Sequence, residues 1–122
     1  MVKRENQKFN LCVEAALKKK ALDLTILDIE ETSSFANYFI ICSGSSNRQV
    51  QAIASSIEHD LKKKRIYPLG IEGFAEGNWI LLDYDDIIIH VFYQKIREFY
   101  ELERLWADAP RVELDVEKKK NI

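Results

Sequence analysis

The sequence predicts one domain of the α/β class, in which a mixed sheet of about five strands is flanked by helices. Apolar residues alternate or run together over short segments, as in strands, and recur at helical spacing over longer ones. In the middle of the chain a strand, a helix and a further strand follow one another, which implies at least one parallel pairing through a right-handed crossover. A hairpin near the end adds an antiparallel pair, so the sheet should be mixed.

The first half of the chain is predicted to form a helix, two strands and a second helix. Residues 6–21 are apolar at every third or fourth position and end in lysines, which suit the negative end of a helix. Residues 24–29 are apolar on both faces, and residues 38–42 form a continuous apolar run typical of a central strand. A serine-rich turn at 43–46 ends that strand, and either one of its serines or Asn47 then caps a helix that runs to about residue 64. The buried stripe of this helix is predicted to comprise Val50, Ile53, Ala54, Ile57 and Leu61.

The second half is predicted to form three strands and a last helix. The strand at 66–70 contains Pro68, which favours an edge position because proline cannot donate to a neighbouring strand. The clearest element is a hairpin of residues 79–83 and 87–93. The helix that follows, residues 94–108, ends before a proline.

Composition limits the classes of function. The net charge is -2, from 18 basic and 20 acidic residues, whereas proteins that grip nucleic-acid backbones usually carry a positive excess. Nucleic acid is therefore not expected as the main ligand. No apolar run approaches the roughly 20 residues that cross a bilayer, and the first residues lack an apolar signal core, so we expect a cytoplasmic protein with no membrane association. The domain should span residues 1–110 and a charged, flexible tail residues 111–122.

The two cysteines and two histidines offer little metal chemistry. Cys12 and Cys42 lie in apolar segments, which predicts buried free thiols rather than a disulfide. No pair of cysteines or histidines has the spacing of zinc ligands, so no metal or other cofactor is expected.

The predicted hairpin sorts its side chains onto two faces, because successive residues of a strand point to opposite sides. Two turn positions are open, and both give the same faces. Face one carries Trp79, Leu81, Asp83, Ile88, His90 and Phe92. Face two carries Ile80, Leu82, Tyr84, Ile87, Ile89 and Val91. Face two must lie against helices. Face one mixes aromatic, acidic and imidazole groups, so it is either a partner-binding surface or a core whose polar groups are hydrogen-bonded internally.

The turn around Gly44 and Ser45 is similar to the Gly-Ser motif of nucleotidyltransferases, which hold two metal ions on carboxylates at alternate positions of a strand. Here Glu58 and Asp60 fall on a predicted helix, where residues two apart point to different sides. A metal-dependent nucleotidyltransferase using this turn is kept as the alternative function.

A thiolate–imidazole pair of Cys42 and His90 is a second hypothesis for chemistry, if their strands are neighbours. The apolar surroundings of Cys42 weaken it, because they raise the pKa of a thiol rather than activate it.

Five segments, taken together, resemble the ribosomal silencing factor (Iojap) family, and the resemblance runs from about residue 23 to residue 109. They are YFIICSGSSNRQ (38–49), EG (72–73), WILLDY (79–84), IHVF (89–92) and REFYELERLW (97–106). Members of this family are similar in fold to nucleotidyltransferases but lack their catalytic carboxylates, so the resemblance implies that the chain is not an enzyme. It departs from the family at Asp85-Asp86, where the family often has Gly-Asp.

The resemblance implies a partner and a mechanism. Family members bind the large ribosomal subunit through its ribosomal protein fourteen, block the joining of the small subunit and lower translation when nutrients are scarce. The family's contact region includes the tryptophan-bearing hairpin, with Trp79 as the expected anchor and acidic groups facing basic ones on the partner. The expected partner-binding residues are Trp79, Leu81, Asp83, Asp86, Ile88, His90 and Tyr100. Whether the chain acts as a monomer or a homodimer stays open.

The last predicted helix carries a polar edge formed by Arg97, Tyr100 and Glu103. This edge either pins the helix to the sheet through a charge-assisted hydrogen bond or extends the docking surface.

Overall fold

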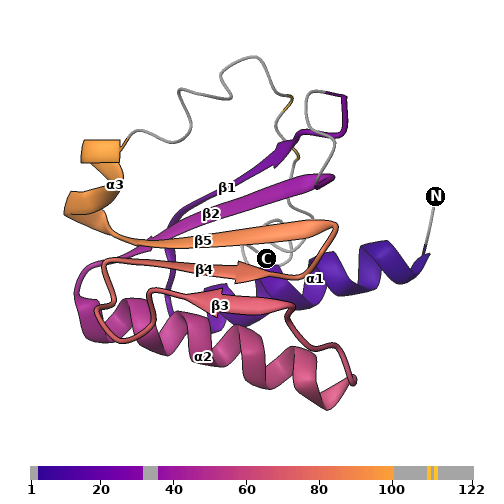
Figure 1. Ribbon diagram of the computed structural model, residues 1–122, viewed down its shortest axis with the longest axis horizontal. Helices are drawn as coiled ribbons and strands as arrows, with labels where there is room; N and C mark the ends of the chain where they lie inside the picture. Colours follow the sequence, from indigo (N-terminus) through magenta and orange to yellow (C-terminus); the bar gives the residue numbers. More distant parts are fainter. Residues whose placement is uncertain (1–2, 32–35, 101–109, 111, 113–122) are drawn as a thin grey trace, which may run out of the picture.

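The computed structural model describes residues 3–31, 36–100, 110 and 112, and Figure 1 shows the arrangement of their elements. In chain order the elements are α1 (Lys3–Lys18), β1 (Leu22–Asp28), β2 (Tyr38–Gly44), α2 (Asn47–Lys63), β3 (Gly70–Glu72), β4 (Trp79–Asp83), β5 (Ile87–Tyr93) and α3 (Gln94–Tyr100). Helices α1 and α2 lie together on one side of the sheet, and α3 leaves the end of β5 (Figure 1). The predicted α/β class is confirmed.

The sheet has five strands in the order β1-β2-β5-β4-β3. Strands β2 and β5 are parallel and lie side by side although a helix and two strands separate them in sequence. The other neighbouring pairs, β1 with β2, β4 with β5 and β3 with β4, are antiparallel. The mixed sheet is therefore as predicted, and β3 occupies an edge, but the parallel partner of β2 is β5 and not β3, the strand that follows α2.

Several element boundaries differ from the prediction: α1 begins at residue 3 rather than 6, β1 spans 22–28 rather than 24–29, and β2 extends to residue 44 rather than 42. Two further differences have a visible cause. Helix α1 ends at Lys18, because Lys20 has a left-handed backbone (φ 63°) and the N–H of Ala21 donates to the carbonyl of Ala16 at 3.2 Å. Strand β3 begins at Gly70 rather than at residue 66, because pairing with β4 starts only when the N–H of Leu69, one residue after the proline, donates to the carbonyl of Asp83 at 2.7 Å. Helix α3 is described to Tyr100, and the rest of the predicted 94–108 helix lies outside the described residues.

The sheet packs on both faces, and the two faces carry different side chains. The face under α1 and α2 is mainly aliphatic and includes all six residues predicted for face two. The opposite face forms a second cluster of Leu27, Ile29, Ala36, Phe39, Ile41, Ile88 and Phe92, with Trp79, Leu81 and Ile96 partly buried against it. The predicted division of the hairpin into two faces is confirmed. Cys12 and Cys42 are free and fully buried in the helix-side core, as predicted.

The edge of β1 that faces away from β2 is hydrogen-bonded to backbone that follows α3. The N–H of Asp28 donates to the carbonyl of Pro110 at 2.8 Å, and the N–H of Val112 donates to the carbonyl of Ile26 at 3.0 Å. Val112 belongs to the segment that the sequence assigns to the tail, so at this position the chain is held against the sheet.

Within the ranges that the structure covers, no helix has both the length and the apolar character needed to cross a membrane.

Candidate functional site

The side chain of Trp79 lies at one end of face one, where the first residue of β4 meets the end of β5. Trp79 pairs directly with Phe92 in the antiparallel ladder, and their rings stack with centroids 4.9 Å apart and planes 28° apart. The indole Nε1–H donates to Nδ1 of His90 at 3.1 Å. Phe92 is fully buried, whereas Trp79 stays partly exposed. Trp79 is therefore a partly exposed indole that a stacked ring and a hydrogen bond hold in place.

His90 is buried among aromatic rings with only 4 % of its surface exposed. Its ring meets Phe39 edge-on at 4.7 Å, and it lies directly opposite Leu81 in the ladder. Burial disfavours the charged imidazolium and lowers the pKa of His90 from 6.5 to about 4. The imidazole is therefore neutral near neutral pH, and its Nδ1 is free to accept the indole N–H.

The hairpin register brings most of the predicted contact residues onto one strip. The ladder pairs Leu81 with His90 and Asp83 with Ile88, which is the register given by a two-residue turn at Asp85-Asp86. Along this strip Ile88 and His90 are buried, while Leu81 and Asp83 are partly exposed like Trp79. The β5 side of face one is therefore core, and its β4 side is partly exposed.

The two acidic residues of the predicted site have different surroundings. Asp83 accepts a hydrogen bond from the N–H of Asp85 at 2.9 Å and stays partly exposed on face one. Asp86 forms an ion pair at 2.5 Å with Lys8 of α1, which also donates to the carbonyl of Tyr84 at 2.7 Å. The carboxylate of Asp86 thus ties the hairpin turn to α1, whereas that of Asp83 contacts only its own turn among the interactions described.

Arg97 and Tyr100 were predicted on one edge of the last helix. The guanidinium of Arg97 donates to the hydroxyl of Ser43 at 2.9 Å and to the carbonyl of Asp23 at 2.8 Å, so it pins α3 to the ends of β1 and β2. Arg97 is 9 % exposed, so of the two roles proposed for this edge it fills the structural one. Tyr100 ends the described part of α3, and its side chain lies outside the described structure.

The loop before Trp79 is held by α2, which the sequence did not indicate. The side-chain amide of Asn47 donates to the carbonyl of Gly77 at 3.0 Å, and that of Gln51 donates to the carbonyl of Phe74 at 2.8 Å.

Gly73 has φ +80°, and a Cβ there would lie 2.2 Å from the carbonyl oxygen of Trp79. The EG segment of the resemblance is the one sequence signal for this contact, because only glycine combines the positive φ with the missing Cβ.

The turn considered for nucleotidyl transfer is filled by a side chain of the protein. Both the backbone N–H and the hydroxyl of Ser45 donate to Oε1 of Gln49, at 2.6 and 2.9 Å. Ser46 caps α2 by accepting from the N–H of Gln49 at 3.1 Å. A Cβ at Gly44 would meet the backbone nitrogen of Val50 at 2.9 Å, so this glycine permits a tight strand-to-helix turn. The backbone N–H groups of Ser45 and Gln49 at this turn are thus already donated within the protein.

The other chemical hypotheses lack their geometry as well. Cys42 lies in the helix-side core and His90 on the opposite face of the sheet, because His90 pairs with Ile41 and not with Cys42 in the parallel ladder. Burial also raises the pKa of the Cys42 thiol to about 12. The thiolate–imidazole hypothesis is therefore wrong. Among the described residues, no group of three or more His, Cys, Asp or Glu side chains could hold a metal ion.

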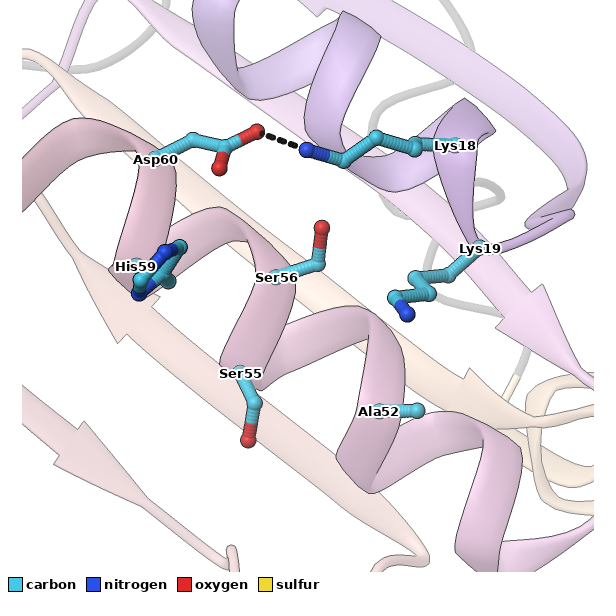
Figure 2. A pocket seen from close by; sticks show the side chains of 7 residues that line it. All are labelled: Lys18, Lys19, Ala52, Ser55, Ser56, His59 and Asp60. Carbon is cyan, nitrogen blue, oxygen red and sulfur yellow. Dashed lines mark hydrogen bonds and ion pairs between the residues drawn. The ribbon is translucent and has the colours of Figure 1, made fainter.

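A separate hollow of about 460 Å³ opens on the helical layer, between the end of α1 and the middle of α2 (Figure 2). It is lined by Lys18, Lys19, Ala52, Ser55, Ser56, His59 and Asp60. Lys18 and Asp60 form an ion pair across it at 2.8 Å, and the hydroxyl of Ser56 donates to the carbonyl of Ala15 at 2.9 Å. These contacts join α1 to α2, so the hollow is the seam between the two helices.

The comparisons with known proteins identify the family. A family model described as "Ribosomal silencing factor during starvation" matches residues 2–122. The chain belongs to the ribosomal silencing factor family. It is 45 % identical over 112 residues to ribosomal silencing factor RsfS of Bacillus subtilis, which covers 90 % of this chain and 95 % of that protein.

More distant relatives and solved structures agree with this assignment. The chain is 30 % identical over 101 residues to "Mitochondrial assembly of ribosomal large subunit protein 1" of Mus musculus, covering 80 % of this chain and 44 % of that one. A crystal structure from Bacillus halodurans, 36 % identical, superposes with a TM-score of 0.81 over 89 % of this chain and 99 % of that chain. The resemblance drawn from the sequence segments is therefore confirmed, and with it the predicted fold.

Proposed function

We propose that this silencing factor docks on the large ribosomal subunit through ribosomal protein fourteen, and so blocks the joining of the small subunit and represses translation when nutrients are scarce. Membership of the silencing factor family supports a ribosomal partner. The name of the mouse relative supports the large subunit in particular. The mechanism is steric: the protein covers a surface that the small subunit needs, and it acts in the cytoplasm without chemical turnover.

One observation carries the assignment of the docking surface to face one. Trp79 is a partly exposed indole that is stacked on a buried ring and hydrogen-bonded by a buried acceptor. Aromatic anchors of this kind are enriched where interfaces bind most strongly, and truncating one costs roughly 2–4 kcal/mol of binding. Leu81 extends the apolar surface along β4, and Asp83 adds an acidic group for a basic partner. Ile88 and His90 lie beneath this strip as its support.

Co-sedimentation with purified large subunits on a gradient tests the proposal. Wild-type protein should travel with the large subunit and prevent its joining to the small one. Trp79→Ala and Asp83→Lys should lose both properties while remaining folded. Ile80→Ala is the matched control, since Ile80 is fully buried on the helix side of the same strand and should lower stability without weakening the docking of the folded fraction.

Two results would defeat the proposal. One is a wild-type protein that travels only with the small subunit or with neither. The other is a pair of results: Asp83→Lys binds the large subunit normally, and Trp79→Ala fails to bind only because it unfolds. That pair would place the docking surface elsewhere on the molecule.

A further inference from the structure

The hydrogen bond between Trp79 and His90 is an unusual use of two aromatic residues on a docking surface. Trp79 pairs with Phe92 and His90 with Leu81, so the two rings are diagonal neighbours across the hairpin, at a separation that long side chains can bridge. The indole has one polar group, its Nε1–H, and that group is given to Nδ1 of His90 at 3.1 Å. The partly exposed anchor therefore has its polar requirement met inside the protein.

Packing alone does not explain a histidine at position 90. The ring lies among Phe39, Phe92 and other apolar side chains. Because Nδ1 accepts, the proton sits on Nε2, and this nitrogen is buried with no hydrogen-bond partner in the part of the chain that the structure describes. A buried donor without an acceptor destabilises a fold, and an apolar group of the same shape would be neutral or better. The imidazole is thus retained at a cost in stability, and the contact that it gains is the one to Trp79.

We propose that His90 is a positioning residue: its Nδ1 acceptor, with the ring of Phe92 beneath, holds the indole of Trp79 in the one orientation that docks. This inference rests on the proposed function and assigns His90 a role in the free protein, whereas the sequence had suggested a direct contact. An indole that is already oriented has less rotamer freedom to lose on binding. Immobilising one such side chain weakens association by about 2- to 10-fold, so this is the gain that His90 should provide.

The same geometry defines the chemistry of the partner surface. Since the indole N–H is already donated, a partner needs no acceptor for it and meets the ring as an apolar surface. Asp83 lies four residues further along β4 on the same face, which places its carboxylate roughly 13 Å from the anchor at about 3.3 Å per residue. The structure therefore fits a protein patch with an apolar side chain, or the stem of a lysine or arginine, over Trp79 and a cation about 13 Å away.

Two substitutions separate positioning from packing. His90→Phe keeps the ring shape and removes the acceptor, whereas His90→Asn keeps an acceptor close to the place of Nδ1. Three properties are measured for each: thermal melting, hydrogen exchange of the Trp79 indole N–H by NMR, and affinity for purified large subunits. His90→Phe should melt at or above the wild-type temperature, lose indole protection and bind about 2- to 10-fold more weakly. His90→Asn should keep the protection and recover most of the affinity.

A double-mutant cycle decides whether His90 acts through the indole. In a Trp79→Phe background, which lacks the N–H, His90→Phe should cause no further loss of affinity. An equal loss in both backgrounds would overturn the positioning role, and so would a His90→Phe protein that loses indole protection yet binds like wild type. If wild-type protein binds no large subunit, the proposed function fails, whereas the exchange measurement still shows whether His90 orients Trp79 in the free protein.

Discussion

Replacing Gly73 by alanine should damage the protein far more than its position in an exposed loop suggests. The backbone at Gly73 has φ +80°, and a Cβ built there lies 2.2 Å from the carbonyl oxygen of Trp79 and 3.3 Å from its carbonyl carbon. Both neighbours are backbone atoms of the first residue in β4, so no side chain can rotate to make room. The loop or the strand must move.

The magnitude follows from two costs. An L residue with left-handed backbone costs roughly 1–2 kcal/mol, and displacing a loop that hydrogen bonds from α2 hold adds a similar amount, about 1–2 kcal/mol, for the contacts that loosen. We therefore expect Gly73→Ala to lower the free energy of unfolding by about 3 kcal/mol. Gly70→Ala is the matched control, because a Cβ added there would meet no atom within 4 Å beyond its chain neighbours, and its backbone belongs to β3. That change should stay within about 0.5 kcal/mol of wild type.

Urea unfolding followed by far-ultraviolet circular dichroism measures both variants on one scale. The midpoint for Gly73→Ala should fall well below that for Gly70→Ala, and the loss should be accompanied by weaker docking because the displaced atoms belong to Trp79. Equal midpoints for the two variants would mean that the loop adjusts freely around Gly73, and the claim that it fixes the start of β4 would then be wrong.

Three further predictions concern titratable and reactive groups. Because burial lowers the pKa of His90 from 6.5 to about 4, only the unfolded chain takes up this proton as the pH falls through that window. Stability is fully present above pH 6.5 and should fall by about 2–3 kcal/mol by pH 4, a loss that urea titrations of His90→Phe should lack. The thiols of Cys12 and Cys42 are buried, with pKa values raised to about 12, so a thiol reagent should label them only at the rate of unfolding. Because Gln49 fills the turn at Ser45, calorimetry should detect no tight binding of Mg²⁺-nucleotide. A nucleotidyl-transfer turnover that Ser45→Ala abolishes would revive the nucleotidyltransferase alternative.

The parts of the fold that were predictable are those set by short-range patterns. The bounds of β4 and β5 came directly from residues of high strand propensity around an acidic turn, and their alternation separated the two faces. The cap and buried stripe of α2 followed from a serine before a helical period. Strand order was not predictable, because the pairing of β2 with β5 depends on how the intervening helix and strands pack and not on any local pattern.

Contacts between distant side chains were not predictable from the sequence. Asp86 was named only as a contact for the partner, and its ion pair with Lys8, 78 positions away, was not anticipated. Asn47 was assigned only to a helix start, yet its amide holds the loop before Trp79, 30 positions on. The Trp79–His90 bond needs both the register and the side-chain conformations, so the sequence placed the two residues on one face without joining them. These three contacts shape the surface proposed for docking, so the sequence could group its residues on one face but could not give the contacts that order them.

The partial burial of Trp79 determines how its truncation must be interpreted. Complete loss of a fully buried tryptophan costs about 3–5 kcal/mol, and a partly exposed one stacked on Phe92 should cost about half of that, roughly 2 kcal/mol. A domain with at least about 5 kcal/mol of stability would then retain about 3 kcal/mol, which keeps about 99 % of the molecules folded. Unfolding alone would thus weaken docking by only about 1 %. Ile80 is fully buried, so Ile80→Ala should lower the free energy of unfolding by about 2–5 kcal/mol. If the folded fraction of Ile80→Ala still travels with the large subunit while Trp79→Ala does not, the lost binding belongs to the exposed side of the indole.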